Sequence, residues 1–496
     1  EAPAPWTPIV KEASSIECWG RKYEFEKNLF PTQITSAGQK LLSRPIILGA
    51  TIDGKEVTAS EAILTWTSIT ESCAEFSAKA MLERVPLTVT SRLEYDGFLW
   101  TELTVSAKPA AAISRLYLDI PMRVESSMLM NGRPSAGQVV LSGKTHAFKS
   151  KLNAKAYCWF GNEMAGLQWS TGDVRDWDNA NRLNTLELIP NGTTENIFRV
   201  NFIDSPTYLD KQLQFTVGLQ ATPVKPLPGQ RRRWDLCLNR VRPFEGRPGW
   251  SFYLSGWNAD GKMTDGHYGY QVPGSHWEGL WQSLKAQHQE PWIYWHMHGM
   301  WRGAPVYRGF RSEWSDIGSP TPLDPQKAPP LAVQWICRES TSFRDFAVWR
   351  VWKSFKDTPS LMSEVAGFYN DCAQASRWCA SRTHGCGRED ESGMIQRTYE
   401  LLGTRELQKR FYVMVKNELG GKLIANHQSG DVQMSQLAFA DMMVTGEHLT
   451  NIAGIMKDKS YYNVLSPENL RAEYAAQPWG LPMVFLPEIG QGRIQA

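Results

Sequence analysis

The 496-residue sequence has no long apolar run, no excess of either charge and few cysteines. A membrane-spanning helix needs about 20 consecutive apolar residues, so we expect no membrane span. A formal net charge of +2 argues against a nucleic-acid partner. A phosphate-binding glycine motif, a dinucleotide fingerprint and a Gly-x-Ser-x-Gly elbow are also missing. We therefore expect no cofactor, and we expect no bound metal because no recognisable metal-ligand pattern is present.

Eight cysteines fit either an exported protein with one or two disulfides or an intracellular protein with free thiols. The first residues, Glu1–Trp6, contain neither the basic nor the apolar part of a signal peptide, as is typical of a mature N-terminus. We expect a secreted, periplasmic or cell-surface protein.

Tryptophan, by contrast, is abundant, with 21 residues. Indole rings stack on the apolar faces of sugar rings while polar groups bind the hydroxyls. Large β-rich domains also use tryptophan as core filler, so the composition leaves both interpretations open. A carbohydrate is the partner that it favours.

Residues 1–220 have the pattern of an antiparallel β-sandwich. Short runs of alternating apolar and polar residues recur and are separated by Asp-Gly and Asn-Gly turn signals. Examples of the expected strands are Ala62–Thr67, Leu87–Glu94, Phe98–Val105, Leu116–Ile120 and Leu213–Leu219.

A proline-rich linker is predicted at residues 221–234, where Ala221–Pro228 contains three prolines. Proline stiffens a chain and removes the N–H that strand pairing needs. Residues 235–496 then form the second predicted domain.

In that second domain, expected strands alternate with helices, which indicates a parallel sheet of the (β/α)8 TIM-barrel type. Seven strands are expected, so the barrel is incomplete or miscounted. They are Ser251–Ser255, Trp292–Trp295, Leu331–Ile336, Val365–Tyr369, Lys422–Ala425, Leu437–Val444 and Met483–Leu486. The expected helices are Phe343–Lys356, Arg405–Leu419 and Pro467–Ala476, the last with Ser466 as its N-cap.

Two carboxylates are the candidate catalysts. Asp371 ends the fourth expected strand and Glu447 follows the sixth, so with one strand between them they should face each other across the barrel mouth. A carboxylate pair roughly 5–10 Å apart is what glycoside hydrolysis requires. Asp371 would be the nucleophile or base and Glu447 the acid, with Asp441 as the rival catalyst.

Further polar and aromatic residues are expected to bind substrate at the same mouth. His427 ends the fifth strand, and it could contact a sugar hydroxyl, tune a neighbouring acid or sit in the core. The other candidates are Asn370, Trp295, His298, Trp378 and His384.

The loop after Asp371 carries Cys372, Cys379 and Cys386 together with His384. Its spacing lacks the tight Cys-x-x-Cys pair of structural zinc sites. A disulfide between Cys372 or Cys379 and Cys386 is therefore the preferred interpretation.

Several segments resemble a known family. Trp159–Trp169 and Gly218–Pro226 resemble the N-terminal half of glycoside hydrolase family 123 and its uncharacterised relatives, and the second half of the chain is closer to those relatives. The segments in the second half are Gly367–Asp371, His384–Gly387, Arg405–Glu406 with Lys409–Arg410, and Phe439–Asp441 with Gly446–Glu447. The resemblance implies a β-sandwich followed by a catalytic TIM barrel, often with a further β domain.

The sequence departs from family 123 in one respect. That family uses an adjacent Asp-Glu pair with substrate assistance, and no such pair ends an expected strand here; Arg388–Glu391 has the wrong order. N-acetylgalactosamine specificity is therefore not carried over. The strand positions of the two acids are instead similar to the layout of the alpha-galactosidase clan.

These observations together predict a glycoside hydrolase that cleaves a polysaccharide or glycan with two carboxylates. One alternative is a polysaccharide lyase that uses Tyr369 or His427 as its base. The other is a non-catalytic glycan-binding or scaffold protein that keeps an aromatic mouth, formed by Trp257, Trp295, Trp301 and Trp378.

Overall fold

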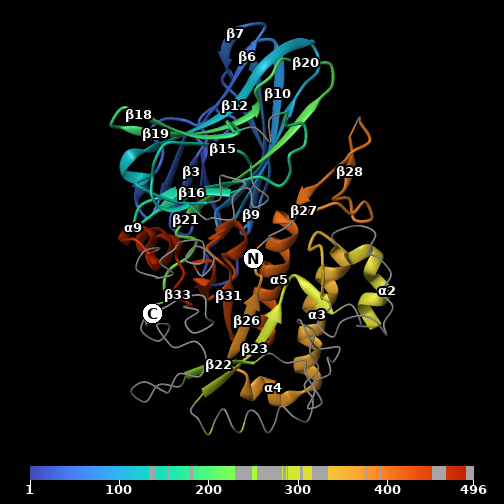
Figure 1. The fold of residues 1–496 in the computed structure, drawn as a ribbon. Helices are drawn as coiled ribbons and strands as arrows, with labels where there is room; N and C mark the ends of the chain where they lie inside the picture. The colour runs from blue at the N-terminus through green and yellow to red at the C-terminus, as the bar shows by residue number, and fades with distance from the viewer. Residues whose placement is uncertain are drawn as a thin grey trace, which may run out of the picture.

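The computed structural model describes residues 1–132, 141–152, 157–178, 183–228, 249–253, 282, 286, 289–301, 305–315, 333–374, 378–390, 392–449 and 465–486. An antiparallel β region is followed by a parallel α/β region, which confirms the predicted order (Figure 1). None of the helices in the described ranges combines the length and apolar character that crossing a membrane requires.

The first region contains three antiparallel sheets. The nine-stranded sheet has the order β14 (Leu141–Lys144), β13 (Leu129–Gly132), β16 (Tyr157–Gly161), β17 (Gly166–Ser170), β21 (Leu213–Thr222), β11 (Phe98–Val105), β10 (Val85–Glu94), β9 (Cys73–Leu82) and β8 (Ile63–Ile69). The seven-stranded sheet has the order β15 (Phe148–Ser150), β18 (Leu186–Asn191), β19 (Glu195–Ile203), β12 (Ala111–Arg123), β6 (Ile47–Ile52) and β7 (Lys55–Thr58), with β20 (Thr207–Leu209) paired to β12. The five-stranded sheet runs from β1 (Val10–Glu12) through β2 (Ser15–Cys18), β3 (Arg21–Glu24) and β4 (Gln33–Ser36) to β5 (Gln39–Lys40), and the 3₁₀ turn η1 covers Val124–Ser126.

The two larger sheets pack face to face through aromatic side chains. Phe160 of β16 and Trp169 of β17 contact Phe198 of β19, with ring centroids 5.1 and 5.7 Å apart. Phe202 of β19 meets Phe215 of β21 at 4.7 Å. These contacts join the inner faces into one core, as expected for a β-sandwich.

The second region is built on six parallel strands. They are β22 (Gly249–Tyr253), β23 (Gln289–His296), β26 (Gly367–Asp371), β31 (Leu423–His427), β32 (Met442–Thr445) and β33 (Met483–Phe485). Each strand pairs with the next one in chain order, which is the arrangement of a (β/α) barrel wall. The helices are α2 (Pro305–Trp314), α3 (Thr341–Asp357), α4 (Pro359–Glu364), α5 (Leu401–Glu418), α6 (Met434–Leu437), α9 (Pro467–Asn469) and α10 (Ala476–Trp479), with the π-helical turn η3 (Leu470–Tyr474) between the last two.

Two expected strands of this region are corrected by the structure. Within the run Leu331–Ile336, the described residues from 333 onward include β25 (Val333–Trp335), which pairs antiparallel with β24 (Gly299–Trp301), while β23 pairs directly with β26. The run Leu437–Val444 is divided between the end of α6 and β32. Most residues between these two elements are apolar for another reason, since this part of the chain packs on the N-terminal segment. The ring centroids of Phe439 and Trp6 are 5.5 Å apart.

The expected helices are confirmed, whereas the first two residues of the predicted linker, Ala221 and Thr222, belong to β21. The expected helices correspond to α3, to α5 and to the α9–α10 segment, which begins with a capping box between Ser466 and Asn469. The predicted linker is packed at its start, because the carbonyl of Val224 accepts a hydrogen bond from Trp6 Nε1 at 2.8 Å and its N–H donates to Trp479 at 3.0 Å. Residues 229–234 of that linker lie outside the described residues.

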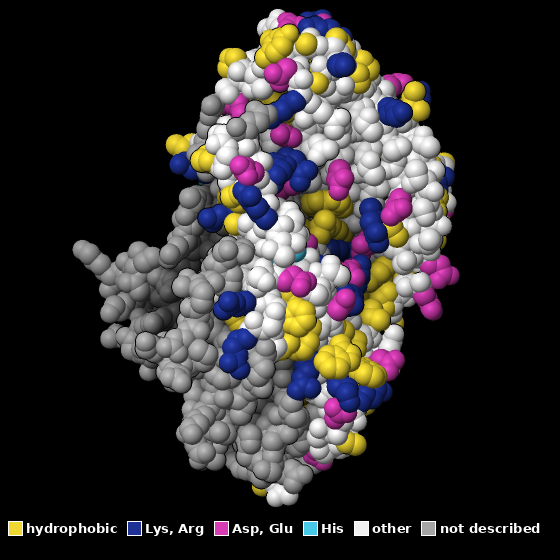
Figure 2. Space-filling view, turned by 90° about the vertical axis from the view of Figure 1, so that its right-hand side faces the viewer, with side chains coloured by type: hydrophobic (Ala, Val, Ile, Leu, Met, Phe, Trp, Pro, Cys, Tyr) yellow, Lys and Arg dark blue, Asp and Glu magenta, His cyan; other side chains and the backbone are white. Residues whose placement is uncertain are grey.

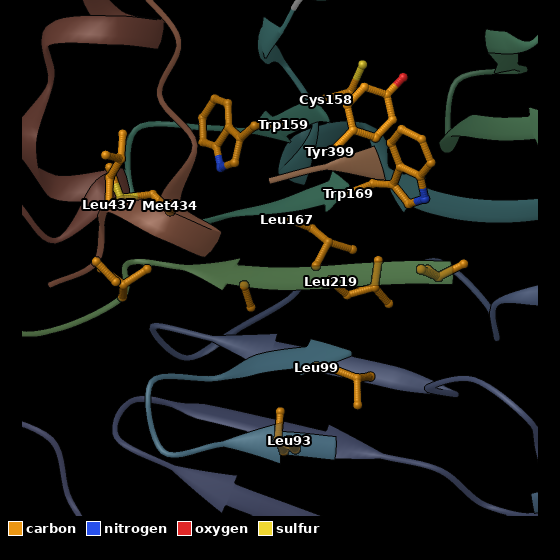
Figure 3. Close-up of a cluster of buried hydrophobic side chains, with 14 of the residues drawn as sticks. Leu93, Leu99, Cys158, Trp159, Leu167, Trp169, Leu219, Tyr399, Met434 and Leu437 are labelled. Atoms are coloured by element: carbon orange, nitrogen blue, oxygen red, sulfur yellow. The ribbon is translucent and has the colours of Figure 1, made fainter. Parts of the chain in front are cut away.

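The sandwich and the α/β region share a polar and apolar contact surface. Arg405 of α5 is buried and pairs with Glu94 at 2.8 Å and with Asp96 at 2.6 Å, both from the β10–β11 hairpin. Helix α6 packs on β17 and β21, with Met434 and Leu437 facing the sandwich (Figure 3). The α/β strands are therefore held against a rigid scaffold.

Candidate functional site

Alternate side chains of β23, β26, β31 and β32 share one face of the parallel sheet. A small core on this face contains Trp292, Tyr369, Ala425, Met442 and Val444, all buried. Strand register places these residues in successive layers, as the interior of a barrel requires. The layer at the carboxyl ends of the strands is polar, and it forms the candidate active site.

His296, Asp371 and His427 make up that polar layer. His296 of β23 is paired in register with Asp371 of β26. His427 ends β31, and its Nδ1 lies 2.8 Å from Asp371 Oδ1. Three neighbouring strands thus deliver three titratable groups to one point. This is where the chemistry of a (β/α) barrel is expected.

Asp371 is surrounded by hydrogen-bond donors. Its Oδ1 accepts from His427 and, at 2.8 Å, from the backbone N–H of Cys372, while its Oδ2 accepts from the hydroxyl of Tyr294. Burial alone would raise the pKa of Asp371, but the hydrogen bond and charge of His427, the charge of His296 and the bond from Tyr294 hold it well below its usual range. Asp371 is therefore an ionised carboxylate at neutral pH.

Glu447 lies on the other side of His427. Its Oε2 is 3.7 Å from His427 Nε2 and accepts a hydrogen bond from Ser429 at 3.1 Å. One imidazole ring therefore lies between the two carboxylates, an arrangement compatible with the separation of about 5–9.5 Å in glycosidase acid pairs. The Glu447 side chain is 45% exposed and the Asp371 side chain 22% exposed, so Glu447 is the more accessible of the two.

Sequence reasoning did not identify Tyr294, and of the two histidines that follow Trp295 it selected His298, not His296, for the substrate site. Burial lowers the pKa of His296, against the opposing charge of Asp371, which favours the neutral imidazole. Burial raises the pKa of Tyr294, and the adjacent Asp371 carboxylate raises it further, so its hydroxyl stays protonated and donates. The sequence did contain a signal, because side chains alternate between the two faces of a strand. Tyr294 and His296 lie on the face that presents Asp371, whereas Trp295 lies on the opposite face.

Asp441 is not brought to this layer. It directly precedes β32, and its backbone N–H donates to Ile424 near the start of β31, at the opposite end of the strands from Asp371. Its carboxylate accepts from Lys416 Nζ at 2.7 Å and from the Ile424 N–H at 2.8 Å. This geometry is that of a structural anchor between α5 and the sheet.

Several expected substrate-binding residues face the helices and not the interior. Trp295 is 1% exposed and stacks against Phe411 of α5 at 4.3 Å, so no ring face is open to a sugar. Asn370 donates to Asn426 at 3.0 Å, and that residue donates to Gln408 of α5. Both side chains belong to the packing between the sheet and α5.

The remaining candidates also lie elsewhere. His298 is fully buried, with Nε2 3.4 Å from Glu400. Trp378 packs edge-on against Tyr399 at 4.8 Å, beside the sandwich. Of the other tryptophans proposed for an aromatic mouth, Trp257 lies outside the described residues and the side chain of Trp301 is not described.

His384 lies beside cysteines. Its Nε2 is 3.0 Å from the sulfur of Cys379, and Cys386 is 3.7 Å from Cys337, a residue 49 positions earlier in the sequence. No disulfide joins any of the seven cysteines within the described ranges, so the expected disulfide from Cys372 or Cys379 to Cys386 is wrong in this structure. The 3.7 Å between the sulfurs of Cys337 and Cys386 is also much longer than an S–S bond, which is about 2.05 Å.

Three side chains of types that can bind a metal lie close together in the polar layer. Atoms of His296, Asp371 and Cys372 lie within 4.8 Å of one another. Both oxygens of Asp371 already accept hydrogen bonds, from Tyr294 and His427 among others.

The sandwich supports the loop that follows His427. Gln168 of β17 donates to the Val432 carbonyl at 2.7 Å and accepts from the Ser435 N–H at 3.2 Å. Gly430 has a φ of +79°, and a Cβ there would lie 2.7 Å from the ring of His448. This loop also carries Ser429, the partner of Glu447, so the antiparallel region helps to position the site.

A separate cleft lies between the sandwich and the start of α5. Residues on its walls include Trp100, Thr216, Tyr399 and Leu402. On the face shown in Figure 2, acidic and basic side chains are interspersed, without a large area of either sign among the described residues. The cleft does not include the residues of the polar layer.

Comparison with known proteins gives one family match. Residues 9–185 match the third domain of glycoside hydrolase 123, which confirms the resemblance seen in the sequence. A search of the curated proteins found no match.

Solved structures show distant likenesses over nearly the whole chain. An alpha-galactosidase from Lactobacillus brevis is 9% identical, with a TM-score of 0.43 over 99% of this chain and 78% of that one. A GH36 alpha-galactosidase from Geobacillus stearothermophilus is 8% identical, with a TM-score of 0.42 over 98% and 84%. The alpha-N-acetylgalactosaminidase NagBb from Bifidobacterium bifidum is 10% identical, with a TM-score of 0.39 over 94% and 82%.

Proposed function

We propose that this protein is a glycoside hydrolase whose catalytic carboxylates are Asp371 and Glu447. The observation that carries the proposal is the array at the carboxyl ends of β26, β31 and β32, where His427 lies between the two acids. The match of residues 9–185 to a glycoside hydrolase 123 domain supports the same class of activity.

The proposal assigns the two acids different roles. Asp371 is held ionised by His427 and Tyr294, which suits attack on the anomeric carbon or deprotonation of the attacking water. Glu447 is the more exposed group and would donate its proton to the leaving oxygen as the glycosidic C–O bond breaks. Water completes the reaction in either case, directly or by releasing a glycosyl–Asp371 intermediate.

The buried part of the layer would support this chemistry. Neutral His296 can hydrogen-bond a sugar hydroxyl without adding charge, and protonated Tyr294 fixes the orientation of the Asp371 carboxylate. Tyr369 stacks on the His427 ring at 5.5 Å and so limits rotation of the imidazole.

The test compares wild type with Asp371→Asn and Glu447→Gln on a panel of host and plant glycans, with released reducing ends as the readout. We expect each variant to lose about a thousand-fold or more in rate while remaining folded. Glu389→Gln is the matched control, because that carboxylate pairs with Arg382 on an exposed hairpin and should leave the rate unchanged.

Other outcomes identify the alternative functions. Products with a new double bond that absorbs ultraviolet light would indicate a lyase. Glycan binding without any released product would indicate a non-catalytic protein. Full activity in either carboxylate variant would remove that residue from the mechanism.

A further inference from the structure

Four metal-binding side chains meet at one buried point away from the polar layer. Cys337 follows β25, while Cys379, His384 and Cys386 belong to the loop between β26 and α5. Their ligand atoms all lie within 4.8 Å of one another. The three cysteines are between 0% and 4% exposed.

The spacing of these atoms fits a tetrahedral ion. Zinc–sulfur bonds of about 2.3 Å place two sulfurs of a tetrahedral site about 3.8 Å apart. The sulfurs of Cys337 and Cys386 are 3.7 Å apart, and Nε2 of His384 lies 3.0 Å from the sulfur of Cys379. A small shift of that ring would admit an ion at the centre of the four atoms.

Hydrogen bonds around the cluster already orient its ligands. Nδ1 of His384 lies 2.7 Å from the carbonyl oxygen of Glu313, which can only accept, so Nδ1 carries the proton and the Nε2 lone pair faces the sulfurs. The Ser381 N–H donates to the sulfur of Cys379 at 3.4 Å. Outer-shell bonds of these two kinds are what fix the ligands of protein metal sites.

The loop backbone is also shaped for this arrangement. The turn between His384 and Cys386 is made by Gly385, with a φ of +83°. At Gly387, a Cβ would lie 1.9 Å from the carbonyl oxygen of Ala380, so only glycine lets the loop close on itself there. The closure brings His384 and Cys386 back to Cys379.

We propose that Cys337, Cys379, His384 and Cys386 bind one zinc ion as a closed structural site. Three thiolates and an imidazole are a ligand set that selects zinc, and four protein ligands leave no position for a catalytic water. The thiol protons leave to solvent as the metal binds.

The site would connect three parts of the barrel region. It joins the end of β25, where α3 begins, to the loop that follows the Asp371 strand, and through Glu313 it contacts α2. The proposal does not depend on the glycosidase assignment. A disulfide between Cys337 and Cys386 is the competing arrangement, but it would leave Cys379 and His384 unexplained.

The experiment measures zinc by mass spectrometry in the full chain, purified without chelator. We expect about one zinc per chain in wild type, and less than about a tenth of that in Cys337→Ser and Cys379→Ser. Cys372→Ser is the matched control, because this thiol lies on the same loop outside the quartet, and it should keep the zinc.

A second pair of variants guards against misfolding as the cause of loss. His384→Cys preserves four ligands and should retain about one zinc, whereas His384→Ala should not. Exchange of zinc for Co²⁺ should give intense thiolate-to-cobalt bands in wild type and in His384→Cys.

Two results would overturn the proposal. One is a folded wild-type chain that takes up neither zinc nor cobalt. The other is a wild-type chain about 2 Da lighter than its reduced form with a Cys337–Cys386 peptide, which would show a disulfide instead.

Discussion

Nδ1 of His427 and Oδ1 of Asp371 lie 2.8 Å apart, joining the carboxyl ends of two neighbouring parallel strands. Because an ionised carboxylate only accepts hydrogen bonds, Nδ1 carries the proton and Nε2 faces Glu447. The pair therefore sets both the charge of Asp371 and the orientation of the imidazole between the acids.

Replacing His427 with alanine should change the pH dependence of glycan cleavage. His427 lowers the pKa of Asp371 through its hydrogen bond and its charge, so its loss raises that pKa. Activity that requires ionised Asp371 is lost as pH falls through this pKa, and the acidic limb of the profile should move to higher pH. The measurement is kcat/KM against pH for wild type and His427→Ala.

Tyr294→Phe is the control for that shift. It removes another hydrogen bond to Asp371 that has a smaller influence on the pKa, so its acidic limb should move less. An acidic limb at the same pH in wild type and His427→Ala would show that Asp371 is not the group responsible for it.

Asp441→Asn should lower the free energy of unfolding and leave the catalytic rate unchanged. The substitution removes the charge paired with Lys416 at 2.7 Å, at the opposite end of the strands from Asp371. We expect a loss of about 1–3 kcal/mol in the free energy of unfolding, measured with urea, and an unchanged kcat. A thousand-fold fall in kcat at wild-type stability would instead return Asp441 to the catalytic pair.

Arg405→Met should strongly destabilise the junction between the sandwich and the α/β region. It leaves Asp96 buried without its cation and Glu94 with only Lys409 and Arg92, and removing one partner of a buried pair costs about 3–5 kcal/mol. Adding Glu94→Gln and Asp96→Asn to Arg405→Met should recover part of that loss, because no unpaired charge remains. Equal stability of the single and triple variants would contradict this account.

The ion pair between Arg405 and Glu94 should also make the free energy of unfolding depend on pH. Burial opposes ionisation of Glu94, but Arg405 and Lys409 lower its pKa to about 2, against about 4.3 in an unfolded chain. A depressed carboxyl pKa stabilises the fold above the unfolded value, and that contribution disappears as pH falls through the folded value. The stability difference between wild type and Arg405→Met should therefore narrow from about pH 4 to pH 2.

The sequence predicted elements well where local pattern and burial agree. Alternation located β10 and β11, and the polar end of β26 located Asp371. It failed where burial comes from distant segments. Phe439 was assigned to a strand because it is apolar, but its ring is buried against Trp6 of the N-terminal segment. Cys337 was missed because Cys386, which it contacts, lies 49 positions away.

The structure places Trp295 away from the polar layer for a related reason. A strand has two faces, and the sequence did not show which face of β23 turns inward. The structure places His296 inside beside Asp371 and Trp295 outside against α5. Trp292, which was not proposed, belongs to the inner face.

Lys225→Met should remove a rise in the free energy of unfolding that wild type shows as the pH becomes alkaline. Lys225 is buried between the rings of Trp6 and Tyr412 and donates to the carbonyl of Ala440. Burial lowers its pKa to about 8, against about 10.4 in an unfolded chain. Between these values the unfolded state binds more protons, so this lysine makes wild-type stability rise with pH.

The expected size of this effect is about 3 kcal/mol between pH 8 and pH 10.4, from about 1.4 kcal/mol per pH unit. Urea unfolding of wild type and Lys225→Met at both pH values measures it as a difference of differences, which cancels the tyrosines and thiols that titrate in both proteins. Lys422→Met is the comparison, since Lys422 also donates to backbone carbonyls, from Met362 and Val365; burial lowers its pKa as well but at a more exposed position, so its substitution should change the pH dependence less. A pH dependence that is the same in wild type and Lys225→Met would mean that the buried amine keeps its ordinary pKa, with the hydrogen bond to Ala440 and the two rings replacing the lost hydration.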